Sequence, residues 1–130
     1  MTNAAGNRRR FERLNVPPMY TPVSVRLAGE RKFRRDGHSY DLSEGGIQFE
    51  LDDYIAPGTT VGLRIELPAS FGGEADSQRE VFVTGNVVWA DESEPGPVRL
   101  AVAFTKFASE ADRDRLLARL RVVIRRRNAA

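Results

Sequence analysis

The sequence predicts a mainly β fold, a small barrel or sandwich of five or six antiparallel strands followed by one C-terminal helix. From residue 21 onward, apolar and polar residues alternate along several short segments, as in half-buried strands. Clusters of glycine and proline separate these segments, with no long crossover between them, which favours an antiparallel meander. Near residue 109 the apolar spacing changes to that of a helix.

Five segments have the alternating pattern. In chain order they are "TPVSVRLA" (21–28), "GIQFEL" (46–51), "TVGLRIEL" (60–67), "EVFVTGNVVWA" (80–90) and "VRLAVAF" (98–104). One face of each is apolar, and the alternation in the fourth segment extends to Trp89, which we therefore expect in the core.

The segments between the strands have the composition of turns. They are "AGERKFRRDG" (28–37), "DDYIAPG" (52–58), "PASFGGEADS" (68–77) and "DESEPGP" (91–97). His38 follows the first of them directly, so we expect it in a loop. The basic residues of "GERKFRRDG" are interpreted as a solvated hairpin tip, with a docking patch for an acidic partner as the alternative.

The C-terminal helix is predicted over about residues 109–127. Its apolar residues recur at helical spacing between arginines, and they are Leu116, Leu117, Leu120, Val123 and Ile124. Ser109 and Asp112 resemble a capping box at its start. The apolar stripe is expected to close one end of the barrel, with dimerisation as the alternative.

Composition indicates one compact domain, because the 130 residues are 41% hydrophobic and 29% charged. We divide it into a flexible arginine-rich arm (1–14) and a barrel with its helix (15–130). Cysteine is absent, which is compatible with a reducing compartment. No apolar run reaches the ~20 residues of a membrane span, and the first residues lack a signal-peptide segment, so we expect a cytoplasmic protein.

The sequence offers little for catalysis. His38 is the one histidine, and with no cysteine present a metal site is not expected. His38, Asp41 and Ser43 are close neighbours on one stretch, whereas a catalytic triad converges from separate segments. No glycine-rich loop leads from a strand into a helix, so nucleotide-binding loops of that type are also absent. We therefore predict that the protein is not an enzyme.

The stretch "NRRRFER" (7–13) concentrates arginines ahead of the first predicted strand. Lysine occurs only at Lys32 and Lys106, and arginine differs from lysine in presenting a planar fork that fits phosphates and the O6/N7 edge of guanine. By itself such an arm is typical of a disordered, solubilising tail.

The stretch "YDLSEGGIQFE" (40–50) places a carboxylate, a hydroxyl and two glycines ahead of a strand. In one interpretation, Asp41 and Ser43 form side-chain turns with the backbone while Gly45 and Gly46 adopt positive φ. In the other, Asp41 accepts hydrogen bonds from a base, Ser43 adds a hydroxyl contact and Gly46 leaves room for a ligand. Nothing in the stretch itself separates the two.

Together, however, the two stretches resemble the PilZ domain family of bacterial receptors for cyclic di-GMP. Arg8, Arg9 and Arg13 form RRxxxR, and 28 residues later Asp41, Ser43 and Gly46 form DxSxxG. The order of the remaining segments is similar to that of the family across essentially the whole chain. The resemblance implies a six-stranded antiparallel β-barrel with a C-terminal helix, and a ligand site made of these six residues. Ala101 stands where the family often has glycine. Trp89 stands near the place where some relatives have a side chain next to the ligand, so the resemblance implies a ligand contact as the alternative to a core position for Trp89.

The resemblance implies a function without catalysis or cofactor. The arm is expected to order around cyclic di-GMP and to relay the signal to an effector protein. One alternative is a PilZ-like scaffold that binds no nucleotide and acts through protein contacts alone. Another is a small barrel that binds RNA or DNA. We do not expect it, because such proteins stack bases on exposed aromatic side chains, whereas most aromatic residues here occupy strand positions that alternate toward the core.

Overall fold

The structure is a computed structural model that describes residues 14–15, 21–67 and 79–129, with side chains for 21–67 and 79–120. These described residues form seven strands and one helix. They are β1 (Leu14–Asn15), β2 (Thr21–Leu27), β3 (Arg35–Leu42), β4 (Gly46–Leu51), β5 (Thr60–Glu66), β6 (Glu80–Asp91), β7 (Val98–Phe107) and α2 (Glu110–Ala129).

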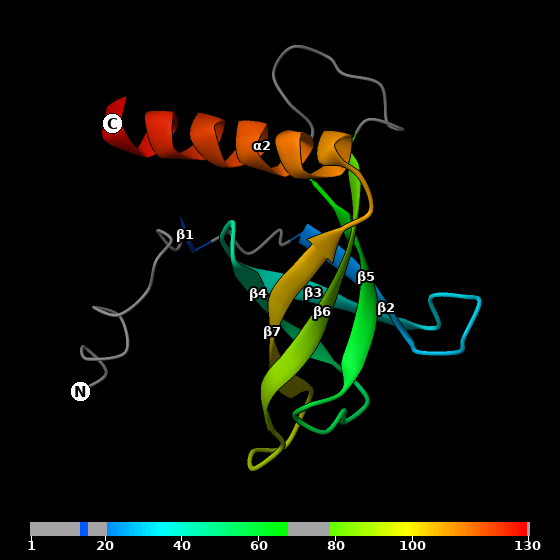
Figure 1. The fold of residues 1–130 in the computed structure, drawn as a ribbon. Helices are drawn as coiled ribbons and strands as arrows, with labels where there is room; N and C mark the ends of the chain where they lie inside the picture. The colour runs from blue at the N-terminus through cyan, green and yellow to red at the C-terminus, as the bar shows by residue number, and fades with distance from the viewer. Residues whose placement is uncertain (1–13, 16–20, 68–78, 130) are drawn as a thin grey trace.

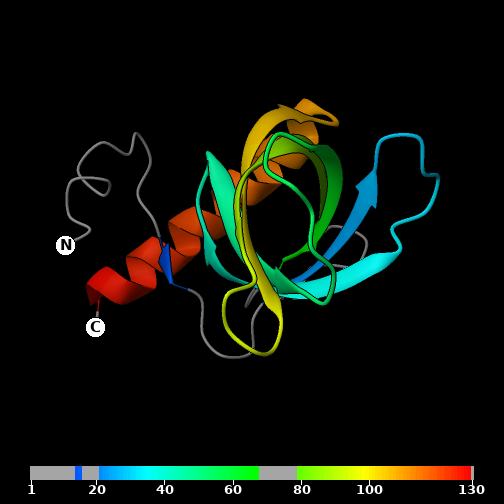
Figure 2. The same cartoon turned by 90° about the horizontal axis from the view of Figure 1, so that it is seen from below.

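Six of the strands close into an antiparallel barrel (Figures 1 and 2). The hydrogen-bonded order is β1-β3-β2-β5-β6-β7-β4, and β4 pairs back with β3 to complete the ring. The short strand β1 lies outside the ring and pairs with the end of β3. The predicted six-stranded barrel with a C-terminal helix is therefore confirmed.

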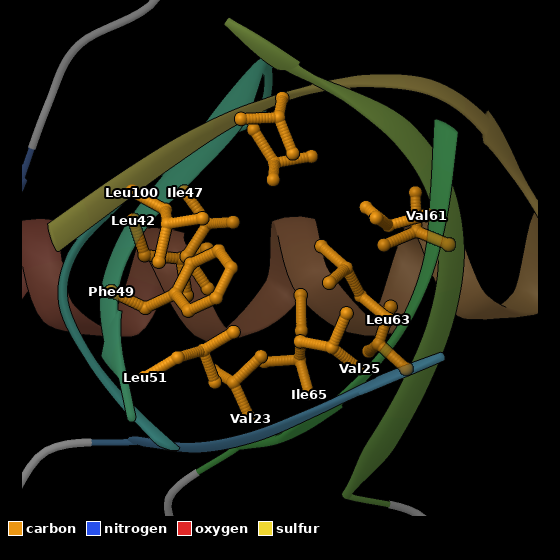
Figure 3. Close-up of a cluster of buried hydrophobic side chains, with 14 of the residues drawn as sticks. Val23, Val25, Leu42, Ile47, Phe49, Leu51, Val61, Leu63, Ile65 and Leu100 are labelled. Atoms are coloured by element: carbon orange, nitrogen blue, oxygen red, sulfur yellow. The ribbon is translucent and has the colours of Figure 1, made fainter. Parts of the chain in front are cut away.

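Alternation along the strands fills the barrel with apolar side chains, which Figure 3 shows pointing toward one another from all sides. Val23, Val25, Phe49, Leu63 and Ile65 are each at most 1% exposed. Successive side chains of a strand point to opposite faces, so the residues between them form the outer wall. The packed interior leaves the outer wall as the face of the sheet that can present polar side chains.

The helix α2 lies across one end of the barrel (Figure 1), and Leu116 is fully buried against the core. Ser109 caps its start, because the Ser109 hydroxyl accepts a hydrogen bond from the Asp112 amide at 3.1 Å. The Asp112 carboxylate departs from the usual capping box and accepts from the Phe82 amide of β6 at 2.7 Å. The helix thus closes one end of the barrel, as expected. Val123 and Ile124 of the apolar stripe lie beyond the described side chains. Dimerisation through this stripe stays a hypothesis.

The expectation that His38 sits in a loop is wrong, because residues from Arg35 onward form β3. Two features make β3 difficult to recognise from the sequence. Gly37 resembles a turn residue, yet here it allows close approach of β4, since an added Cβ would collide with the Glu50 carbonyl. The second is a register shift between Ser39 and Asp41, which interrupts the alternation.

Of the four predicted turn regions, 68–77 lies outside the described residues, and the other three contain strand connections. The first of these extends too far, since residues 35–37 belong to β3. Ile55 in the β4–β5 connection is 5% exposed and joins the core. No helix in the described part of the chain is long and apolar enough to cross a membrane.

Candidate functional site

A bulge in β3 turns Asp41 to the outer wall of the barrel. Ser39 pairs with Phe49 and Asp41 pairs with Gln48, so Tyr40 is an extra residue on β3. Without it, Asp41 would point inward with Ser39. With it, Leu42 enters the core and the Asp41 carboxylate lies on the opposite face, at 8% exposure. Bulges often re-aim side chains in this way next to functional sites.

A second bulge, in β6, does the same for Trp89. Val87 pairs with Val102 and Trp89 with Ala101, so Val88 is the extra residue. Trp89 is 38% exposed, and the expectation that it belongs to the core is wrong. The physical reason is the added residue, which reverses the alternation that holds from Val81 to Val87.

The two bulges place Asp41 and Trp89 in one row across the outer wall. Asp41 pairs with Gln48 of β4, Gln48 with Ala101 of β7, and Ala101 with Trp89 of β6. Because directly paired residues share a face, the four side chains lie on the same side of the sheet. We call this set the outer row. Gln48 could not be predicted from the sequence, because its pairing with Asp41 and Ala101 depends on the strand register.

The arginine motif lies outside the described residues. Arg8, Arg9 and Arg13 all precede β1, where the description of the chain begins. Within β1, Leu14 pairs with Leu42 and Asn15 with Asp41. Leu14, which directly follows Arg13 of the arginine motif, therefore pairs with the residue next to Asp41 of the second motif.

Ser43 and Gly45 form a tight turn between β3 and β4. The Gly45 amide donates to the Ser43 hydroxyl at 3.2 Å, and the Ser43 amide donates to the Gly46 carbonyl at 2.9 Å. The interpretation of Ser43 as a turn-forming residue is confirmed by these bonds. The turn also rests on β7, because the Phe104 amide donates to the Gly45 carbonyl at 2.9 Å.

Gly46 is required by strand packing rather than by backbone conformation. Within the described residues, positive φ occurs at Gly29, Gly58 and Gly96, so the expectation of positive φ at Gly45 and Gly46 is wrong. A Cβ on Gly46 would instead lie 2.5 Å from the carbonyl oxygen of Val102. The absence of a side chain lets β4 and β7 approach closely at the start of the motif strand.

His38 belongs to the solvent-exposed part of β3, where it pairs with Pro22 and Glu50. In the part of the chain that the structure describes, no group of three or more histidine, cysteine, aspartate or glutamate residues is arranged to hold a metal ion. The chemistry that the outer row presents is that of a binding surface, with one carboxylate, one amide, a small apolar residue and an indole ring.

Comparison with solved structures gives matches over nearly the whole chain. The PilZ domain of YcgR with c-di-GMP from Escherichia coli matches with a TM-score of 0.63 at 15% identity, covering 95% of this chain and 99% of that one. MotI/DgrA, an inhibitor of motility from Bacillus subtilis, matches with a TM-score of 0.66 at 19% identity, over 92% of this chain and 53% of that one. The K. pneumonia MrkH–c-di-GMP complex matches with a TM-score of 0.65 at 14% identity, over 94% and 55%.

At these identities the similarity is one of fold, and this chain spans about half the length of MotI and MrkH. A search of curated protein sequences gave no match. A family model supplies the decisive comparison, because the model of the PilZ domain matches residues 7–121 and so includes both motifs. With the closed barrel, the terminal helix and this match, the chain belongs to the PilZ domain family.

Proposed function

We propose that the protein is a receptor for cyclic di-GMP and binds it on the outer row. The observation that carries the proposal is the pairing of β1 with β3, which brings the segment after the arginine motif next to Asp41. Membership of the PilZ family and the c-di-GMP complexes of YcgR and MrkH support the same ligand.

The chemistry of the residues fits the ligand. Cyclic di-GMP carries two phosphodiesters and two guanines, and guanidinium forks bind both phosphates and the O6/N7 edge of guanine. In the proposal Arg8, Arg9 and Arg13 supply these forks. The Asp41 carboxylate accepts from the N1 and N2 donors of a guanine, and its low exposure of 8% strengthens such charge-assisted bonds.

The remainder of the outer row fits the flat faces of the ligand. Ala101 has a single methyl group and lies between Gln48 and Trp89, so a purine can lie close to the sheet there. The exposed indole of Trp89 offers a face for stacking at the end of the row. We propose Trp89 as a ligand contact in addition to the six motif residues.

Signal output in this proposal is a rearrangement of the arm, which presents or hides a surface for an effector protein. No step requires catalysis. The competing function is a scaffold that acts through protein contacts without nucleotide. The two differ in one measurable property, which is binding of the ligand itself.

The test is calorimetric titration of the full chain with cyclic di-GMP, with GTP and cyclic di-AMP as controls. Arg9→Ala combined with Arg13→Ala should abolish binding. The matched control is Arg31→Ala combined with Arg34→Ala, which removes the same charge from exposed positions elsewhere. Fluorescence of Trp89, the one tryptophan of the chain, gives a second readout at the outer row.

Saturable binding of cyclic di-GMP, lost in the first variant and kept in the second, supports the receptor. A matching change in tryptophan emission locates the ligand at the outer row. Absence of heat with a folded protein refutes the receptor and leaves the scaffold. Equal loss of affinity in both variants means that the nucleotide is held by general charge attraction rather than by the arginine motif, which contradicts the proposal.

A further inference from the structure

The β2–β3 loop (28–34) is anchored to the outer wall of the barrel by Phe33. The Phe33 ring packs against Phe82 of β6, with the ring centroids 5.9 Å apart. The guanidinium carbons of Arg26 and Arg64 lie 5.6 and 5.3 Å from its centroid. Two cation–π contacts and an aromatic pair therefore hold the middle of the loop in place.

A second anchor is Glu30, which is fully engaged inside the hairpin. Its carboxylate oxygen Oε1 accepts from the Leu27 amide and from the Arg35 guanidinium, both at 2.8 Å. Its backbone carbonyl accepts from Arg26 at 3.0 Å. The pKa of Glu30 is lowered, by the Leu27 amide first and by Arg35 after it, with a smaller electrostatic contribution from Arg34. The Glu30 carboxylate is thus held mainly by Leu27 and Arg35 within the hairpin.

The remaining cations of the loop have no such partner. Arg31, Lys32 and Arg34 are exposed, and none of them takes part in an ion pair or hydrogen bond with the described residues. With Gly29 and Glu30 they line a cleft of about 450 Å³. The cleft has three exposed cations and one carboxylate, and that carboxylate already accepts hydrogen bonds from Leu27 and Arg35. It therefore presents net positive charge to an anionic occupant.

We infer that this loop is a docking site for an acidic segment of a partner protein. The three cations form its charged rim, and we call them the basic tip. In Figures 1 and 2 the hairpin projects from the barrel on the side away from β1, so an occupant here leaves the outer row accessible. The inference does not depend on nucleotide binding and is tested without nucleotide.

Two observations favour a protein segment over other anionic partners. A nucleic acid needs exposed aromatic faces for base stacking, yet Phe33 is already covered by Arg26, Arg64 and Phe82. A membrane surface is met by cations together with exposed apolar side chains. The large exposed apolar residues among the described side chains are Tyr54, Val88 and Trp89, none of which belongs to the loop. Carboxylates match the exposed guanidinium forks.

The test measures the anisotropy of a labelled glutamate-rich peptide during titration with the full chain, beside a glutamine version of the peptide. Arg31→Ser with Lys32→Ser removes two cations of the basic tip. Arg99→Ser with Lys106→Ser is the matched control, since it removes one exposed arginine and one exposed lysine elsewhere. Single-stranded RNA and phosphatidylserine vesicles are tested as competitors.

We expect salt-sensitive binding of the glutamate peptide alone, weakened roughly fivefold by the tip variant and little by the control. Amide chemical shifts should change mainly over residues 29–35. Absence of peptide binding, or equal weakening by both variants, overturns the inference. It is also overturned if the tip variant weakens RNA or vesicle binding more than peptide binding, because the occupant is then of another class.

Discussion

Arg113 of α2 donates a hydrogen bond to the Glu44 carboxylate at 2.7 Å, across 69 positions of the sequence. Glu44 lies between Ser43 and Gly46 of the DxSxxG motif. The contact therefore joins the C-terminal helix to the turn that carries the proposed ligand motif. A displacement of this turn on ligand binding would alter the helix contact directly, without passing through the barrel core.

The strength of this link is expected to be modest. The Arg113 side chain is 49% exposed, so solvent screens the pair and a coupling free energy of about 0.5 kcal/mol is expected. A double-mutant cycle with Arg113→Ala and Glu44→Ala, followed by chemical unfolding, measures it. The coupling should shrink at roughly 1 M salt, and a value that is independent of salt contradicts an ionic link.

Asp41→Asn should weaken binding of cyclic di-GMP about 30-fold, or ~2 kcal/mol, because the amide directs a donor at the donor edge of guanine. Asp36→Asn is the matched control, since Asp36 lies on the same strand and accepts a hydrogen bond from Ser24 at 2.8 Å. Calorimetry of both variants checks the prediction. Equal affinity of the Asp41 variant and the native chain would remove Asp41 from the site.

Ala101→Leu should abolish binding, because a bulky side chain separates the ligand from the sheet between Gln48 and Trp89. Ala101→Gly should retain it. Ala101 is 6% exposed, so the leucine also disturbs its neighbours, and thermal unfolding must be measured alongside affinity. Ala108→Leu, at an exposed position after β7, controls for added apolar surface. Undiminished affinity of a folded Ala101→Leu variant would refute the outer row as the ligand surface.

The Glu30 network should loosen in acid. Hydrogen bonds from Leu27 and Arg35 stabilise the carboxylate and hold the pKa of Glu30 below its ordinary value. A lowered folded pKa means that the stabilisation is present above the unfolded pKa and is lost as the pH falls through the folded one. Amide spectra recorded during an acid titration should show Leu27 shifting with the Glu30 titration. In Glu30→Gln the Leu27 shift should lose this pH dependence.

Much of the barrel could be predicted from local pattern. Residues such as Val23, Phe49, Leu63 and Leu100 alternate with polar neighbours, and all four are buried. The alternation failed as a guide where a strand contains an extra residue, at Tyr40 and at Val88. A bulge cannot be recognised from the alternation of apolar and polar residues, because it depends on the partner strand. Both failures fall beside the candidate site, and a further register shift lies between Thr84 and Gly85 of β6.

The site itself was predictable in part. The sequence motif pointed to Asp41, Ser43 and Gly46, and a turn at Ser43 was one of the two interpretations, but the physical reason for the glycine was not predicted. Ser43 shapes a local turn with Gly45. Gly46 allows β4 to approach β7, and this role depends on Val102, which is distant in the sequence. The same holds for Phe33, which looks like an ordinary loop residue until Arg26 and Arg64 are seen beside it.

Closure of the barrel has a mechanical consequence. Every strand from β2 to β7 has a hydrogen-bonded neighbour on each side, so opening the ring would break a whole ladder of bonds. Such a cylinder is poorly suited to change shape. We expect the barrel to act as a rigid scaffold. A structural change caused by a bound ligand would then involve the elements that contact the outside of the barrel. These are the segment at β1, the Glu44 turn and the helix α2, which contacts that turn.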